Sequence, residues 1–273
     1  MNLSRFLLSC SLLACSFALL AQPPTSPSPY TVPKANVQLM GVEDLQSIDQ
    51  LMVYIPGVGS PSREALTRQN IKSYMMPVRQ APSASQEWAY SLSSCLEYYV
   101  NLNNNFKDNL SPDYIHLSLA AAGNKPNIED GLRFLIEQGT VSAGIVAYGA
   151  PTIPRSVFNV PRYYISNFAY LFRPTTRGRN RIFELRKALS RGNPVIVELR
   201  TGADFSQWRN TEYETALPLT ETHYLTLVGY DEDNESFEVR GTNGRHWADA
   251  GYVKLSYNNL AQYATNAYVI LPY

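Results

Sequence analysis

The spacing of the apolar residues changes once along this chain, and that change limits the fold more than any other feature. From residue 88 onward they return every three or four positions, which predicts a helix with one buried face. A second helix is predicted from Asn127, a good N-cap, to Gly139, a good C-terminal stop, and a third over residues 179–190. The apolar positions of the first helix are Trp88, Leu92, Cys95, Leu96, Tyr99 and Val100.

After residue 190, β-branched and aromatic residues gather in short runs that predict strands. The acidic turn at residues 231–234 joins two of these runs into a hairpin. Helices followed by antiparallel strands indicate an α+β fold in two halves, and ligands favour the groove between such halves. The runs are residues 195–199, 223–230, 236–240, 251–255 and 267–271.

The first 33 residues indicate a targeting segment and a linker. Residues 1–21 combine a short basic start with an apolar stretch too short to span a bilayer, which predicts an export signal of bacterial type. Cleavage after Ala21 is one interpretation. The other is a lipoprotein signal that ends at Ala14 and leaves Cys15 to carry a lipid. Residues 22–33 are rich in Pro and Ser and predict an extended linker.

The rest of the chain is long enough for one domain with its own core. Residues 34–75 are interpreted as an N-terminal extension and residues 76–273 as the domain. Lys plus Arg and Asp plus Glu both number 23, so the formal net charge is zero and no nucleic-acid partner is expected. We expect the protein in the periplasm, anchored at the outer membrane or outside the cell, with membrane contact only through a lipid on Cys15. The sequence has neither a glycine-rich phosphate loop nor a Cys/His metal pattern, so no cofactor or metal is expected.

Several blocks of the domain follow one another in an order and spacing that resemble the papain-like cysteine peptidases. That family opens its domain with a Gln, a short loop and then Cys-Trp-Ala-Phe-Ser at a helix start, and it carries its His at the start of an apolar strand. The resemblance implies a papain-like α+β fold: an N-terminal helical half, a C-terminal antiparallel β half and a cleft between them. The matching blocks are Gln80, Glu87-Trp88-Ala89-Tyr90-Ser91, Leu110-Ser111-Pro112, residues 222–230 with His223, and Gly244, Trp247 and Gly251-Tyr252.

The resemblance also implies which residues stand at the family's site. In the family, a Cys thiolate at a helix N-terminus faces the His, an Asn orients the His, and the Gln stabilises the oxyanion. His223 and Gln80 match this pattern. Glu87, however, stands at the Cys position and Gly241 at the Asn position. The resemblance thus describes a degenerate site.

Glu87 can be interpreted in two ways. As a carboxylate at a helix N-terminus, it could pair with His223 and reproduce the charge pair of an active enzyme without its reactivity. Alternatively, it is a first-turn helix glutamate exposed in a disused groove. Either way, a carboxylate is a far poorer acyl-transfer nucleophile than a thiolate, so ordinary cysteine proteolysis is not expected.

The leading hypothesis is an exported papain-like pseudopeptidase that binds a peptide or protein partner in or near the cleft. One alternative is a hydrolase in which Glu87 acts as general base and His223 as acid. Another pairs Cys95 with His223, although Cys95 lies eight residues past Glu87 on the apolar face, which favours an inert buried thiol. A third is a structural component of the cell envelope tethered through Cys15.

Overall fold

The structure of the protein is a computed structural model. It describes residues 40–59, 67–104, 107–121, 123 and 125–273, all of which belong to the unit Val32–Tyr273. The predicted export signal and the linker lie outside these residues. Within the described ranges, no helix has the length and apolar character needed to cross a bilayer.

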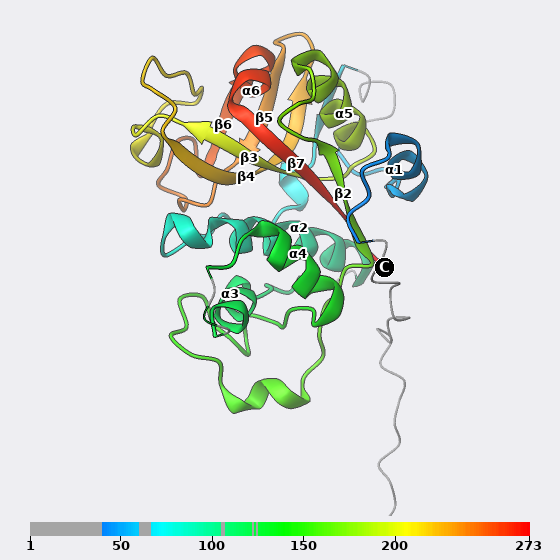
Figure 1. Cartoon of the computed structure of the whole chain (residues 1–273), viewed down its shortest axis with the longest axis vertical. Helices are drawn as coiled ribbons and strands as arrows, with labels where there is room; N and C mark the ends of the chain where they lie inside the picture. The colour runs from blue at the N-terminus through cyan, green and yellow to red at the C-terminus, as the bar shows by residue number, and fades with distance from the viewer. Residues whose placement is uncertain (1–39, 60–66, 105–106, 122, 124) are drawn as a thin grey trace, which may run out of the picture. The chain divides into compact units, whose positions relative to one another are not determined.

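Three helices form the N-terminal half of the domain (Figure 1). The longest is α2 (Glu87–Asn104), and both α3 (Pro112–Ala120) and α4 (Ile128–Glu137) pack against it. Helix α4 begins where the sequence predicts: the Asn127 side chain accepts hydrogen bonds from the next turn in a capping box, a device that stabilises a helix by about 1 kcal/mol. Gly131 has no Cβ and therefore lets α4 lie directly against the indole of Trp88.

The second half is a seven-stranded sheet whose named strands all pair antiparallel. Its order is β2-β7-β3-β4-β5-β6, with β1 pairing onto β4. The five predicted runs are confirmed as β3 to β7, and the α+β prediction is confirmed with them. The strands are β1 (Arg68–Asn70), β2 (Asn167–Phe172), β3 (Val195–Thr201), β4 (Glu221–Asp231), β5 (Ser236–Arg240), β6 (Tyr252–Ser256) and β7 (Ala264–Leu271).

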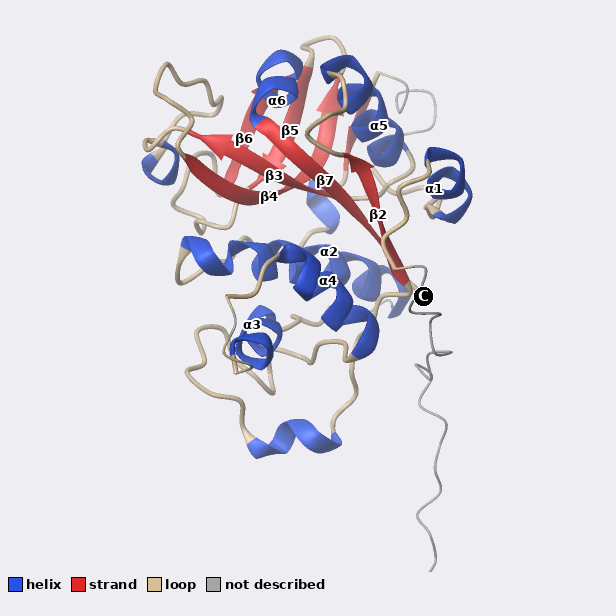
Figure 2. Cartoon of the chain, in the orientation of Figure 1, coloured by secondary structure: helices blue, strands red, loops and turns tan. Residues whose placement is uncertain are grey.

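Helices cover both faces of the sheet (Figure 2). Helix α2 packs on one face, mainly against β4, whereas α5 (Gly178–Ser190) and α6 (Tyr257–Tyr263) pack on the other. Alternating side chains of β3 supply both cores, because successive residues of a strand point to opposite faces: Val195 and Val197 pack with α5, and Ile196 packs with α2. On β4, Thr226 and Val228 face α2, whereas Leu225 and Leu227 face α5. His223 lies near the beginning of this strand, where its ring reaches Glu87 at the start of α2. The remaining helices are α1 (Leu45–Leu51) and the 3₁₀ turns Lys72–Tyr74, Ala84–Gln86, Arg155–Asn159 and Phe205–Gln207.

Candidate active site

Glu87 is the first residue of α2 and is placed there by the 3₁₀ turn Ala84–Gln86. The indole N–H of Trp88 donates to the carbonyl of Ser85 at 2.8 Å and fixes this turn onto the helix. A negative charge in the first turn is stabilised by the helix dipole. Glu87 is nevertheless buried, with only 2% of its surface exposed. Its carboxylate therefore needs a partner inside the protein.

That partner is His223. Its imidazole Nδ1 lies 2.9 Å from each carboxylate oxygen of Glu87, and it too is 2% exposed. The backbone N–H of Tyr224 adds a longer bond of 3.3 Å to Glu87 Oε2. Of the two interpretations that the sequence leaves open for Glu87, the structure has the buried pair and not the exposed glutamate.

A second carboxylate, Glu221, contacts the other side of the His223 ring. Its Oε2 lies 3.3 Å from Nε2, and its side chain is 41% exposed. Burial lowers the pKa of His223, but the hydrogen bond and charge of Glu87, followed by those of Glu221, outweigh it and raise the pKa above its ordinary value. When it is protonated, the ring donates to a carboxylate from each nitrogen. The sequence analysis missed Glu221, although residues i and i+2 of a strand share a face and that rule could have found it.

Aromatic side chains enclose the pair on the sheet side. The ring of Phe205, from the 3₁₀ turn Phe205–Gln207, lies 4.7 Å from the ring of His223 between centroids. Trp247 packs on Phe205 at 5.0 Å, and its indole N–H donates to the Phe205 carbonyl at 2.7 Å. These contacts hold the imidazole in one orientation and exclude water from the pair.

Gly241 has no side chain that could contact His223. A Cβ built on Gly241 would lie 2.6 Å from the six-membered ring of Trp247, well inside van der Waals contact. The indole thus fills the space that a side chain at this position would need. Because Glu221 already contacts the Nε2 side of His223, the ring has an orienting partner although residue 241 has no side chain.

We expect Gly241→Asn to lower the free energy of unfolding by about 1–3 kcal/mol, since the new side chain must displace the buried indole of Trp247. Urea unfolding measures the change. The matched control is Gly144→Asn, because a Cβ there makes only an ordinary contact, 3.5 Å from Ser142 Oγ. Equal losses in the two variants would contradict the account of Trp247.

The pKa of His223 also predicts a stability that falls as the pH rises. The folded-state pKa lies above 6.5, so the contribution is complete below pH 6.5 and is lost as the pH rises through the folded-state value. Burial raises the pKa of Glu97 from 4.5 to about 7. This shift also makes stability fall as the pH rises, but only between those two pH values. We therefore expect the free energy of unfolding to go on falling above pH 7 in the native protein and to stay level there in His223→Gln. Urea titrations from pH 7 upward test this, and parallel curves for the two proteins would contradict it.

Gln80 lies apart from the buried pair. Its side chain is exposed, and it forms an isolated β-bridge with Asn243, next to a hydrogen bond of 2.7 Å from Ala81 N–H to the Thr242 carbonyl. Within the described residues, no hydrogen bond joins Gln80 to Glu87 or His223. The structure thus brings together two of the predicted site residues and places the third on a neighbouring loop.

Cys95 lies about two turns along α2 from Glu87. It is fully buried, and its Sγ contacts Thr226 Oγ1 at 3.9 Å. Burial raises the pKa of the thiol to about 12, which keeps it protonated at neutral pH. A protonated, inaccessible thiol is a poor nucleophile. In the part of the chain that the structure describes, no three His, Cys, Asp or Glu side chains gather in a way that could hold a metal ion.

Comparison of the sequence with known proteins gives one family. The sequence model described as papain family cysteine protease matches residues 67–273. The protein named gamete and mating-type specific protein A from Dictyostelium discoideum is 25% identical over 206 residues, which are 72% of this chain and 44% of that protein. The chain therefore spans less than half of the length of the curated relatives it matches.

Solved structures agree with this match. The bromelain protease from Ananas comosus superposes with a TM-score of 0.61 and 19% identity, over 76% of this chain and 99% of that one. Xylellain, a cysteine protease from Xylella fastidiosa, superposes with a TM-score of 0.60 and 16% identity, over 89% of this chain and 98% of that one. At such identities the likeness shows the fold alone, and the papain-like α+β fold predicted from the sequence is confirmed.

Proposed function

Because the chain belongs to the papain family of cysteine proteases, we propose that it is an exported pseudopeptidase that binds a peptide or protein partner without cysteine-dependent hydrolysis. One observation carries the proposal. Glu87, at the start of α2, forms a buried ion pair with His223, where the family resemblance assigns the nucleophile and its histidine. The frame of an active site is retained, and its reactive atom is replaced by a carboxylate.

The geometry of the pair opposes nucleophilic catalysis. Both oxygens of Glu87 face Nδ1 of His223 at 2.9 Å, and the two residues are each 2% exposed. A reacting carbonyl would have to approach the attacking atom to about 3–3.5 Å, which the enclosed pair does not allow. Attack by a carboxylate would also form a high-energy anhydride.

The same geometry opposes the alternative in which Glu87 acts as general base on water. A general base must reach its water directly by a hydrogen bond. The carboxylate of Glu87 already accepts from His223 and from the N–H of Tyr224, and Phe205 covers the imidazole. The Cys95 alternative is opposed by the burial of the thiol and its raised pKa.

The surface around Gln80 is polar and suits a peptide. Gln80 is exposed, and its β-bridge partner Asn243 is half-buried. Glu221 presents a partly exposed carboxylate at the start of β4. A relative carries a name, gamete and mating-type specific protein A, that does not refer to proteolysis, which is compatible with a binding role.

Selection from a random peptide library on the purified chain tests the binding role. We expect enriched peptides to lose at least tenfold in affinity on Gln80→Arg, which places a bulky charge beside Asn243. The matched control is Arg179→Gln, an exposed change on α5. Helix α5 packs on the face of the sheet opposite α2. Peptides that bind the native chain and both variants equally would overturn the proposed location.

Mass spectrometry of the protein recovered from its producing cells tests export. A mature N-terminus at Gln22, or a lipid-modified Cys15, supports it. An N-terminus at Met1 in the cytoplasm overturns it.

A further inference from the structure

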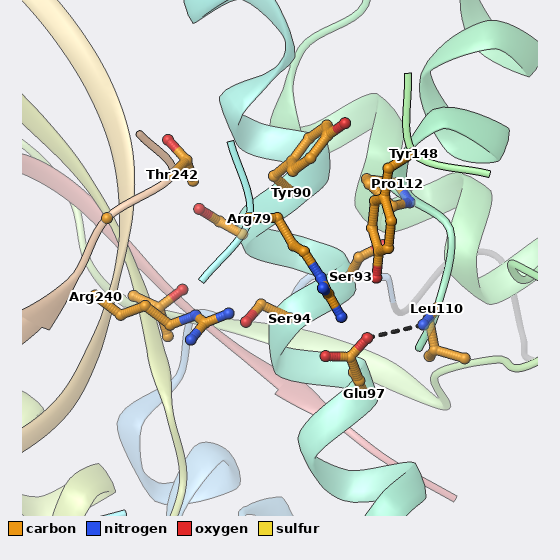
Figure 3. Close-up of a pocket in the computed structure, with 13 residues that line it drawn as sticks. Arg79, Tyr90, Ser93, Ser94, Glu97, Leu110, Pro112, Tyr148, Arg240 and Thr242 are labelled. Carbon is orange, nitrogen blue, oxygen red and sulfur yellow. Dashed lines mark hydrogen bonds between the residues drawn. The ribbon is translucent and has the colours of Figure 1, made fainter. Parts of the chain in front are cut away.

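A small polar cavity lies between α2 and the sheet, farther along α2 than Glu87 (Figure 3). Its volume is about 20 Å³, enough for one particle of about the size of a water molecule. Arg79 lies along α2 and reaches toward Glu97, whereas Arg240 extends from the sheet side toward Ser94 (Figure 3). The cavity is separate from the buried pair, since neither Glu87 nor His223 lines it.

The cavity lining holds polar atoms that have no hydrogen-bond partner within the described residues. The three hydroxyls among these atoms belong to residues that are almost fully buried: Ser93 is 3% exposed, Ser94 is 9% and Thr242 is 5%. Buried polar groups are nearly always hydrogen-bonded, so several unpartnered atoms around one cavity indicate an occupant that accepts their bonds. Each of them can donate a hydrogen bond. The atoms are Arg79 Nε, Ser93 Oγ, Ser94 Oγ and Thr242 Oγ1.

The charge of the lining favours an anion over water. Arg240 is 4% exposed, and its guanidinium donates to the neutral oxygens of Met76, Pro77 and Tyr252 at 2.7–3.0 Å. Arg79 donates to the side-chain oxygen of Asn109 and lies over the ring of Tyr148. Within the described part of the chain, neither arginine has an ion-pair partner. An arginine as buried as Arg240 is rarely left without one.

Glu97 is the one carboxylate among the residues that line the cavity. Its Oε2 accepts the backbone N–H of Leu110 at 2.8 Å. Burial raises its pKa to about 7, so near neutrality it carries only part of a negative charge. The lining therefore has an excess of positive charge, and the Arg79 and Arg240 side chains both extend toward α2 (Figure 3).

We propose that this cavity binds a small monovalent anion of halide size, such as chloride. Ser93, Ser94 and Arg79 Nε donate to it, and Arg240 supplies charge. The anion would also brace α2 against the segment that carries Arg79. Halide binding would thus stabilise the frame of the candidate active site, since Glu87 is the first residue of α2.

Crystals of the full chain grown in sodium bromide test occupancy directly. Anomalous diffraction at the bromine edge should show a peak in the cavity within contact distance of Arg79 Nε and the hydroxyls of Ser93 and Ser94. A cavity that holds only water under these conditions would overturn the proposal.

Thermal unfolding tests the same site at ordinary concentrations. In sodium chloride the melting temperature should rise by about 3 °C or more over sodium gluconate of equal ionic strength, and the rise should saturate. Ser94→Ala removes one donor, so it should reduce the rise severalfold. The control is Thr201→Val, because Thr201 is also buried with an unpartnered hydroxyl but does not line the cavity. A bromide peak without any chloride-dependent rise would mean binding at crystal concentration only, and it would overturn the proposed stabilisation.

Discussion

Replacing Glu87 by alanine lowers the free energy of unfolding by about 3–5 kcal/mol, because it leaves a buried imidazolium without its nearest counter-charge. Both members of the pair are 2% exposed, so neither water nor a rotated surface side chain can compensate. Glu221 remains, but it contacts the other nitrogen at 3.3 Å from a partly exposed position. The variant should therefore be destabilised most at acidic pH, where the histidine carries its proton.

A double-mutant cycle separates the pair from the packing around it. Glu87→Leu with His223→Leu should be less destabilised than either single change, since replacing both members of a buried ion pair by apolar residues is often close to neutral. Glu43→Ala serves as the matched control, because Glu43 pairs with Arg173 at the surface and its loss should cost at most about 1 kcal/mol. Urea unfolding of the native chain, Glu87→Ala, both single leucine variants, the double variant and Glu43→Ala measures all of these values. A loss below about 1 kcal/mol for Glu87→Ala would contradict the buried pair as a stabilising element.

Replacing Glu87 by cysteine creates a reactive thiol in a chain whose native Cys95 is inert. A thiol at a helix N-terminus beside an imidazolium has a pKa near or below neutrality and is largely thiolate at pH 7. The pKa of Cys95 is raised to about 12, so only about 1 in 10⁵ of its molecules is thiolate at that pH. The shorter side chain at position 87 also leaves room for a small reagent such as iodoacetamide.

Peptide mapping after brief exposure to iodoacetamide measures this difference. We expect alkylation at position 87 to proceed at least 100-fold faster than at Cys95, and to slow sharply when His223→Gln is added. Gly241→Asn is not needed for this test, since Glu221 contacts the outer nitrogen of the ring. Reaction at position 87 that is no faster than at Cys95 would contradict an intact frame around Glu87.

Much of the fold follows from local patterns, and the exceptions have physical reasons. Helices α2, α4 and α5 and the strands from β3 to β7 carry clear periodicity or caps. Helix α3 was missed, although Ser111 and Pro112 form a readable N-cap and first turn. Strand β2 was missed because its short apolar run, at Asn167–Phe172, has no alternation to distinguish it from a loop or a buried turn.

The site was predictable only in part. Glu87 and His223 are 136 positions apart in the sequence, so their contact followed from resemblance to a family and not from local chemistry. The filling of the space beside Gly241 by Trp247 depends on the path of the loop between them, which includes a positive φ angle at Gly244. No residue pattern encodes such a path. Likewise, the cavity beside Arg240 emerges only when distant segments meet.

Hydrolysis of peptides by the native chain tests the central claim most directly. Fluorogenic peptides of varied sequence would be incubated with the purified protein, with Glu87→Gln and with His223→Gln, each at the same concentration. The account predicts that product formation by all three equals the rate in buffer alone. Turnover by the native chain that falls at least 100-fold in both variants would contradict it and would show that the Glu87–His223 pair is a catalyst.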